Sequence, residues 1–164
     1  MINVSKIRKG LVIDHIKEGQ GFVLYKHLGL NHVDGVVVLM TGILSEKMGK
    51  KDLIKIETDF DIPMDLVGFF ASQSTVNFIE DGQVVKKEKI DLPETLEDIL
   101  SCPNPACVSN HQDVPTRFHL LDKERARYGC AYCDQEVDNG YSQGSGYLLF
   151  RPASLSGICG PRSL

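Results

Sequence analysis

The chain has 164 residues, of which 42% are hydrophobic and 24% charged, and its formal net charge is −4. This composition is typical of a globular protein with one medium-sized or two small domains, and the acidic balance disfavours a general nucleic-acid coat. No apolar run approaches the roughly 20 residues of a membrane-spanning helix, and the first residues lack the apolar segment of a secretory signal. We therefore expect a cytoplasmic protein.

Hydrophobic periodicity and turn residues predict the elements of the first hundred residues. In chain order they are a strand over 11–16, a helix over 20–30, strands over 36–44 and 51–57, a helix opening at Pro63, and a hairpin of strands 75–80 and 84–88 around Asp81-Gly82. The order β-α-β-β-α-β with an added hairpin strand is typical of a ferredoxin-like sandwich, in which helices cover one face of an antiparallel sheet.

The composition changes after the first hundred residues, since all five cysteines lie beyond them. We expect a short helix over 95–100 and short strands over 116–121 and 126–130. From Tyr141 onward Gly, Ser and Pro dominate, and we predict no regular structure there. The sequence thus predicts an α+β protein with a ferredoxin-like domain over 1–94, a small metal-stapled β domain over 95–140 and a tail over 141–164.

Four cysteines form two close pairs, Cys102-x4-Cys107 and Cys130-x2-Cys133, with 22 residues between the pairs. Each short turn presents two thiolates, and together they suit a tetrahedral zinc ion. Four thiolates leave no open position for water, so the predicted site is structural. A domain of roughly 40 residues needs such support because its core is small. We expect one zinc ion per chain.

Other interpretations of this cysteine-rich region stay open. The cysteines are compatible with buried thiols, with two disulfides in a secreted chain, or with an iron–sulfur centre. Cys159 stands alone in the tail and is not an expected ligand. The cations Arg117, Lys123, Arg125 and Arg127 leave nucleic-acid binding open, although a solvated face suits an acidic protein better.

Lysines recur on one predicted strand. Alternate side chains of a strand share a face, so Lys51, Leu53 and Lys55 point the same way, with the lysine backbones roughly 13 Å apart. Both ammonium groups can approach one polyphosphate, and Lys86 or Lys87 of the last hairpin strand can join them. The simpler interpretation is that the lysines protect a sheet edge.

Neighbouring strands add polar and apolar groups to this pattern. Asn77 and Ile79 share one face of their strand, while Asp14 and His15 bring a carboxylate and an imidazole from the first strand. The chain has no Walker loop, no dinucleotide glycine fingerprint and no convincing nucleophile–base arrangement. The pattern therefore favours reversible anion binding over catalysis.

Several segments together resemble one family, the regulatory chain of aspartate carbamoyltransferase. They are GLVIDHI (10–16), MGKKDLIKIE (48–57), TVN (75–77), LPE (92–94), CPNPAC (102–107) and CAYC (130–133). These segments occur in the order and spacing of that family across residues 4–136.

The resemblance implies a non-catalytic allosteric subunit of pyrimidine biosynthesis. It implies a nucleotide-binding domain followed by a zinc domain that contacts the catalytic chain, and regulatory dimers that link catalytic trimers into a dodecamer. ATP activates and CTP inhibits, with UTP as a helper in some members. Two other classes make different predictions. A zinc-ribbon nucleic-acid binder would bind oligonucleotides in a salt-sensitive way, and an independent nucleotide-using enzyme would turn over alone.

The resemblance also names the residues of the allosteric nucleotide site. They are Val4, Ile7, Val12, Asp14, His15, Lys51, Leu53, Lys55, Asn77, Ile79, Val84 and Lys87. Asp14 matches the position that reads the base and ribose, and Lys87 matches the lysine that approaches sugar and phosphates. Gly82 departs from relatives that have an aromatic residue there. The arm before Val4 is short compared with relatives in which it takes part in UTP synergy, and residues 141–164 have no family counterpart.

Overall fold

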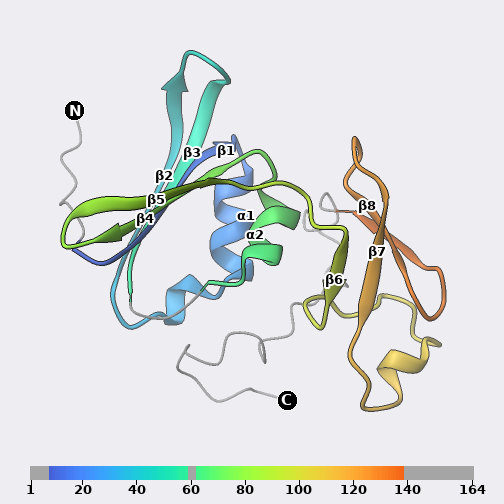
Figure 1. Ribbon diagram of the computed structural model, residues 1–164. Helices are drawn as coiled ribbons and strands as arrows, with labels where there is room; N and C mark the ends of the chain where they lie inside the picture. The colour runs from blue at the N-terminus through green and yellow to red at the C-terminus, as the bar shows by residue number, and fades with distance from the viewer. Residues whose placement is uncertain (1–7, 59–61, 139–164) are drawn as a thin grey trace.

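The computed structural model describes residues 8–58 and 62–138, which form two antiparallel sheets (Figure 1). The first sheet has the order β2-β3-β1-β4-β5 and consists of β1 (Gly10–Lys17), β2 (Val36–Ser45), β3 (Gly49–Glu57), β4 (Thr75–Glu80) and β5 (Gln83–Lys89). Helices α1 (Gln20–His27) and α2 (Met64–Phe70) cover one face of it. This arrangement confirms the predicted α+β fold with a ferredoxin-like first sheet. None of the described helices is long and apolar enough to cross a membrane.

Alternation along the two central strands explains why one face of the sheet is covered. Leu11 and Ile13 of β1 lie opposite Ile56 and Ile54 of β3, and all four side chains are buried. They join Leu24 of α1 in the hydrophobic core. Residues between them on the same strands point to the other face, as the period of two requires. The face opposite the helices therefore receives the alternate residues of both strands, apolar as well as charged.

Helix α1 is shorter than the sequence pattern predicted. The expected helix spanned 20–30, but α1 ends at His27. Gly29 adopts a left-handed φ of 66°, which glycine tolerates without steric cost, and the chain continues as a 3-10 turn at Leu30–His32. The predicted apolar periodicity continued past the helix because Leu28 and Leu30 are both buried beyond its end.

The second sheet contains four short strands in the order β6-β7-β8-β9. They are β6 (Thr95–Glu97), β7 (Arg117–Asp122), β8 (Arg127–Cys130) and β9 (Glu136–Asp138). The prediction of a short helix over 95–100 is wrong. Leu96 lies opposite Phe118 of β7, and both are fully buried, so packing in the sheet overrides the local pattern. Asp98 then takes a positive φ of 56°, which ends the strand.

Helix α2 lies between the two sheets (Figure 1). The ring of Phe69 on α2 meets the ring of Tyr128 on β8 edge-on, with centroids 5.4 Å apart. The Tyr128 hydroxyl donates a hydrogen bond of 2.5 Å to the carbonyl oxygen of Pro93, in the segment that connects the sheets. Both sheets thus share one hydrophobic cluster, and Tyr128 ties the second sheet to the first.

Replacing Tyr128 by phenylalanine is expected to lower the free energy of unfolding by about 1–2 kcal/mol, because the partly buried Pro93 carbonyl loses its donor. Urea unfolding followed by circular dichroism measures this change. Tyr132→Phe is the matched control, since its hydroxyl also donates to a proline carbonyl, that of Pro115, but Tyr132 is 41% exposed. Equal losses in both variants would contradict a special role for the Tyr128 hydrogen bond.

Candidate functional site

One row of side chains crosses the face of the first sheet that the helices leave uncovered. Val12 lies opposite Lys55 on one side and Asn77 on the other, and Asn77 lies opposite Lys87. Directly opposed residues project from the same face, so these four residues of four strands form a continuous row. Lys55 and Lys87 stand at its ends, about 14 Å apart by strand spacing.

Apolar residues flank this row on the same face. Leu53 precedes Lys55 by one alternation on β3, and Ile79 lies opposite Val84 beyond Asn77. Val84 is 56% exposed, whereas Ile79 is only 8% exposed. The face therefore combines two cations at its margins with apolar surface and one amide between them. This combination suits a ligand with a flat, partly apolar part and an anionic part.

A β-bulge places Asp14 and His15 at one end of this face. The register of β1 with β3 shifts between Ile13 and Ile16, so Asp14 and His15 together lie opposite the single residue Leu53. His15 has a positive φ of 60°, and its backbone N–H donates to Asp14 Oδ1 at 2.7 Å. Lys51 Nζ lies 2.8 Å from the same oxygen. The structure thus joins Asp14 with Lys51 before any ligand is considered.

Lys51 favours the ionised form of Asp14 in this bulge. Burial raises the pKa of the Asp14 carboxyl, but hydrogen bonds from Lys51 and from the His15 amide outweigh burial and lower it below its usual value. An ammonium group has three donors, so Lys51 can hold Asp14 and still donate to an anion. Among the described residues the buried Nδ1 of His15 has no hydrogen-bond partner, and it lies 3.7 Å from Asp14 Oδ2.

The structure therefore brings ten of the twelve residues that the resemblance named into one region. The other two, Val4 and Ile7, lie outside the described residues, as does the tail over 141–164. The sequence alone leaves Lys86 and Lys87 as alternatives, and the strand register separates them. Lys87 lies in the row, whereas Lys86 lies opposite Phe78, approaches its ring and pairs with Glu88 at 3.4 Å.

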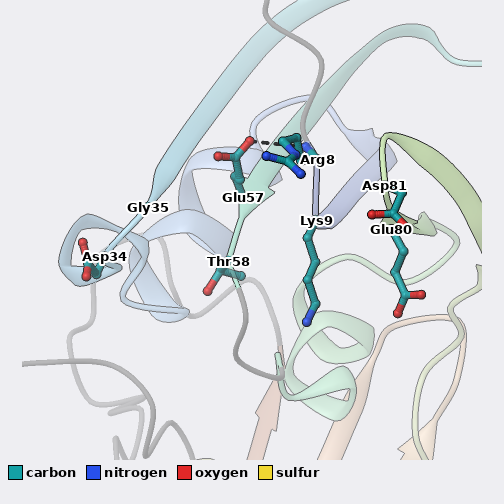
Figure 2. A pocket seen from close by; sticks show the side chains of 8 residues that line it. All are labelled: Arg8, Lys9, Asp34, Gly35, Glu57, Thr58, Glu80 and Asp81. Atoms are coloured by element: carbon teal, nitrogen blue, oxygen red, sulfur yellow. Dashed lines mark hydrogen bonds between the residues drawn. The ribbon is translucent and has the colours of Figure 1, made fainter.

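A cavity of about 630 Å³ opens elsewhere, where β1 begins and β3 ends (Figure 2). Its lining consists of Arg8, Lys9, Asp34, Gly35, Glu57, Thr58, Glu80 and Asp81. Carboxylates outnumber cations there by four to two, and the backbone N–H of Arg8 donates to Glu57 Oε2 at 3.4 Å. A polyphosphate would meet net repulsion in this cavity. The row that ends in Lys55 and Lys87 is therefore the better candidate for anion binding.

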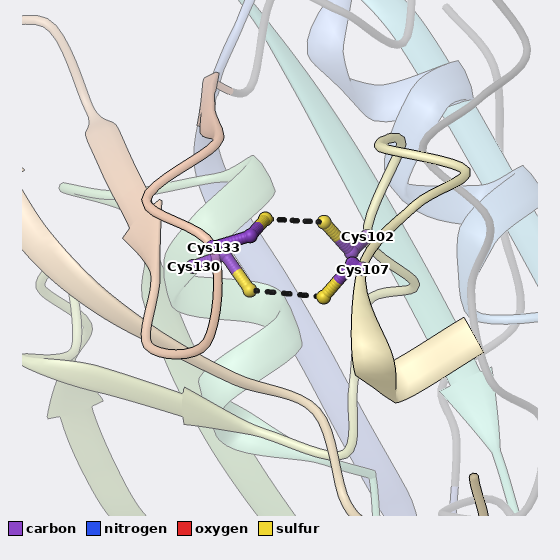
Figure 3. Close-up of side chains that lie close together, drawn as sticks. All are labelled: Cys102, Cys107, Cys130 and Cys133. Atoms are coloured by element: carbon purple, nitrogen blue, oxygen red, sulfur yellow. Dashed lines mark hydrogen bonds between the residues drawn. The ribbon is translucent and has the colours of Figure 1, made fainter. Parts of the chain in front are cut away.

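The four cysteines converge between two turns of the second sheet (Figure 3). Cys102 Sγ lies 3.6 Å from Cys133 Sγ, and Cys107 Sγ lies 3.7 Å from Cys130 Sγ. All four sulfur atoms lie within 4.8 Å of one another. Four thiolates at the usual zinc–sulfur length of about 2.3 Å stand about 3.8 Å apart in a tetrahedron. The donor set therefore fits a tetrahedral metal ion.

Hydrogen bonds hold the two cysteine turns in place. Asn110 Nδ2 donates to the carbonyl oxygens of Cys102 and Asn104, at 3.0 and 2.7 Å. The backbone N–H of Tyr132 donates to Cys130 Sγ at 3.5 Å. Contacts of this kind orient the ligands and tune their charge. The turns are thus built to present sulfur atoms inward.

The thiols differ in their readiness to ionise. Burial raises the pKa of Cys102 and Cys130. Burial also acts on Cys107, but hydrogen bonds with Ser109 outweigh it and bring the pKa of that thiol to about 7. A metal ion needs all four thiolates, so its binding releases protons and weakens as the pH falls.

Two alternatives from the sequence are now resolved. The disulfide interpretation is wrong, because the sulfur separations are far longer than the roughly 2.05 Å of a disulfide. The four cations near the cysteine loop each lie within 4 Å of a carboxylate: Arg117 of Glu97, Lys123 of Asp91, Arg125 of Asp122 and Arg127 of Glu136. These pairings disfavour a basic nucleic-acid surface.

One candidate residue, Asp52, was not predicted from the sequence. The alternation that places Lys51 and Leu53 on the open face places Asp52 on the covered face, where it is fully buried. A carboxylate at an inward position of a strand was the available signal, because buried carboxylates need partners.

Comparison with known proteins gives two family matches. The model described as the aspartate carbamoyltransferase regulatory chain, allosteric domain, matches residues 2–91. The model described as the metal binding domain of the same regulatory chain matches residues 94–141. The boundary between the matches falls in the segment between β5 and β6, and the second match contains all four clustered cysteines.

Curated relatives are similar over most of their length, and each is named aspartate carbamoyltransferase regulatory chain. The protein from Clostridium botulinum (strain Hall) is 38% identical over 141 residues, which cover 85% of this chain and 97% of the relative. The Clostridium tetani protein is 39% identical over 137 residues, which cover 82% of this chain and 95% of the relative. The Bifidobacterium longum protein is 37% identical over 137 residues, which cover 83% of this chain and 99% of the relative.

Proposed function

The chain belongs to the family of aspartate carbamoyltransferase regulatory chains, and from this premise we propose how it regulates. It binds ATP and CTP in competition on the open face of the first sheet, with UTP as a further ligand. Through its second domain it contacts the catalytic chain. As a regulatory chain it performs no catalysis itself.

The row that joins Lys55, Val12, Asn77 and Lys87 is the observation that carries this proposal. The lysines supply charge for phosphates, and the central residues supply apolar contact and an amide for a base or sugar. Asp14 lies beside them and can accept hydrogen bonds from ribose hydroxyls. The family match to an allosteric domain supports effector binding in this part of the chain, and the row suits an anionic effector.

Regulation requires that the nucleotides bind two quaternary states unequally. Typical coupling free energies of about 1–3 kcal/mol suffice to shift such an equilibrium. The effect must travel from the open face to the second sheet. Helix α2 and the contact between Phe69 and Tyr128 lie on this path.

The metal ion has a structural role in this proposal, and zinc is the ion that four thiolates suit best. Cys102, Cys107, Cys130 and Cys133 would hold it and so shape the surface that meets the catalytic chain. When bound, it supplies folding free energy rather than chemistry.

We further propose the assembly that the family resemblance implies. Two regulatory chains form a dimer, and such dimers link catalytic trimers into a dodecamer in the cytoplasm. The nucleotide domain spans 1–94 and the zinc domain 95–140. Mass determination by light scattering of the mixed chains tests the stoichiometry.

Replacing Lys55 by alanine is expected to weaken both ATP and CTP by about tenfold or more, because a charge-assisted hydrogen bond to phosphate is lost. Titration calorimetry on the zinc-loaded chain measures both affinities. Lys86→Ala is the matched control and should change neither affinity appreciably, since Lys86 pairs with Glu88 and lies outside the row.

Unchanged affinities in Lys55→Ala would remove its assigned role. The same preparation separates the competing classes. A nucleic-acid binder would instead bind an oligonucleotide in a strongly salt-dependent way. An independent enzyme would consume nucleotide without a partner.

A further inference from the structure

Asp52 is a fully buried carboxylate that accepts three backbone hydrogen bonds from two separate segments. Its Oδ2 accepts the N–H groups of Gly19 and Gly21, both at 3.0 Å, at the start of α1. Its Oδ1 accepts the N–H of Gly42 on β2 at 3.2 Å. Gly19 precedes α1 without a side-chain cap of its own, so Asp52 caps the helix from a neighbouring strand.

Irregularities in both neighbouring strands meet at this residue. In β1 the bulge at Asp14 and His15 ends at Ile16, which lies opposite Asp52. In β2 the register shifts between Met40 and Ile43, so the bulge on that strand includes Gly42. A bulge leaves an amide out of the ladder, and Asp52 binds the freed N–H of Gly42. The Asp52 side chain thus binds the irregular backbone of β2 on one side of β3 and, on the other side, the start of α1, which follows β1.

The immediate neighbour of Asp52 is Lys51, whose ammonium group pairs with Asp14 at 2.8 Å on the opposite face. Asp14 belongs to the β1 bulge, which ends at Ile16, the residue opposite Asp52. We propose that Asp52 is a positioning residue of the nucleotide site. By binding the β2 bulge and the start of α1, it holds the chain that follows the β1 bulge, and so keeps Asp14 in place to pair with Lys51. This inference rests on the proposed nucleotide site for its functional meaning.

The geometry around Asp52 leaves little freedom. A Cβ at Gly21 would lie 2.7 Å from Asp52 Cβ and 2.8 Å from Oδ2, so only glycine admits the carboxylate this close to the helix. In Asp52→Asn one carboxylate oxygen becomes an NH2 group, which cannot accept a hydrogen bond. At least one of the three backbone N–H groups then loses its partner while the shape of the side chain is kept.

The test uses the full zinc-loaded chain and two readouts. Titration calorimetry with CTP should show about tenfold weaker binding in Asp52→Asn. In addition, Lys51→Ala should cost far less affinity in the Asp52→Asn background than in the native chain, because the two residues act through one geometry. Without nucleotide, carboxylate NMR should show the pKa of Asp14 moving up toward its ordinary value in Asp52→Asn.

Leu66→Ala controls for general destabilisation, because Leu66 is fully buried on α2. The proposal is overturned if Leu66→Ala weakens CTP as much as Asp52→Asn does, or if Asp52→Asn leaves both CTP affinity and the Asp14 pKa unchanged. If the native chain binds no CTP, the proposed function fails, and the Asp14 pKa alone decides the positioning role. If Asp52→Asn does not fold, Gly21→Ala displaces the same carboxylate and must likewise weaken CTP binding and raise the pKa of Asp14.

Discussion

Replacing Cys107 by serine is expected to abolish metal binding, order in the second sheet and assembly with the catalytic chain together. A tetrahedral thiolate site contributes on the order of 10–16 kcal/mol of folding free energy in small zinc domains, which a serine hydroxyl cannot replace. Cys107 is almost fully buried and its Sγ lies 3.7 Å from that of Cys130. Elemental analysis gives the metal content, and gel filtration with the catalytic chain gives the assembly.

Cys159→Ser is the matched control for this experiment, because Cys159 is the cysteine that the sequence did not assign to the metal. It should retain one zinc ion per chain and assemble normally. A Cys107→Ser chain that kept its zinc and formed the complete complex would refute the structural role of the site.

Replacing Phe69 by alanine is expected to lower the free energy of unfolding by about 3–5 kcal/mol, since a large buried ring leaves a cavity. Phe69 is fully buried, and its ring meets those of Phe70 and Tyr128 at centroid distances of 4.9 and 5.4 Å. Thermal and urea unfolding measure the loss. The variant also removes the ring that joins α2 to the second sheet.

Nucleotide binding should survive in Phe69→Ala, because the proposed site lies on the other face of the sheet. The response of the assembled enzyme to nucleotide should fall instead. Phe22→Ala is the control, with a side chain 59% exposed on α1 and an expected change within about 0.5 kcal/mol. If Phe69→Ala were as stable as the native chain and as responsive, α2 would not be the connection between the domains.

Local pattern was sufficient to predict the first sheet and its lysine face. Strand 51–57 alternates so regularly that the shared face of Lys51 and Lys55 followed from the period of two alone. The cysteine spacing was equally direct, because ligand pairs on short turns need no knowledge of the rest of the chain. The lysine face and the cysteine pairs are both determined by residues that are close in the sequence.

What the sequence did not reveal depends on residues far apart in the chain. Residues 95–100 read as a short helix because Phe118, which Leu96 faces, lies more than twenty positions away. The bulge at Asp14 is defined by the register between β1 and β3, and no local residue pattern predicts it. The partners of Asp52 come from two other segments, and Tyr128 contacts Phe69 and Pro93, which lie 35 or more positions before it in the chain.

The most direct test of the regulatory role mixes the purified chain with its catalytic partner and measures carbamoyltransferase activity with and without ATP and CTP. Both nucleotides are expected to change the activity of the complex and to leave that of the isolated catalytic trimer unchanged. A complex that assembles fully but has the same activity with either nucleotide as without would contradict the regulatory role.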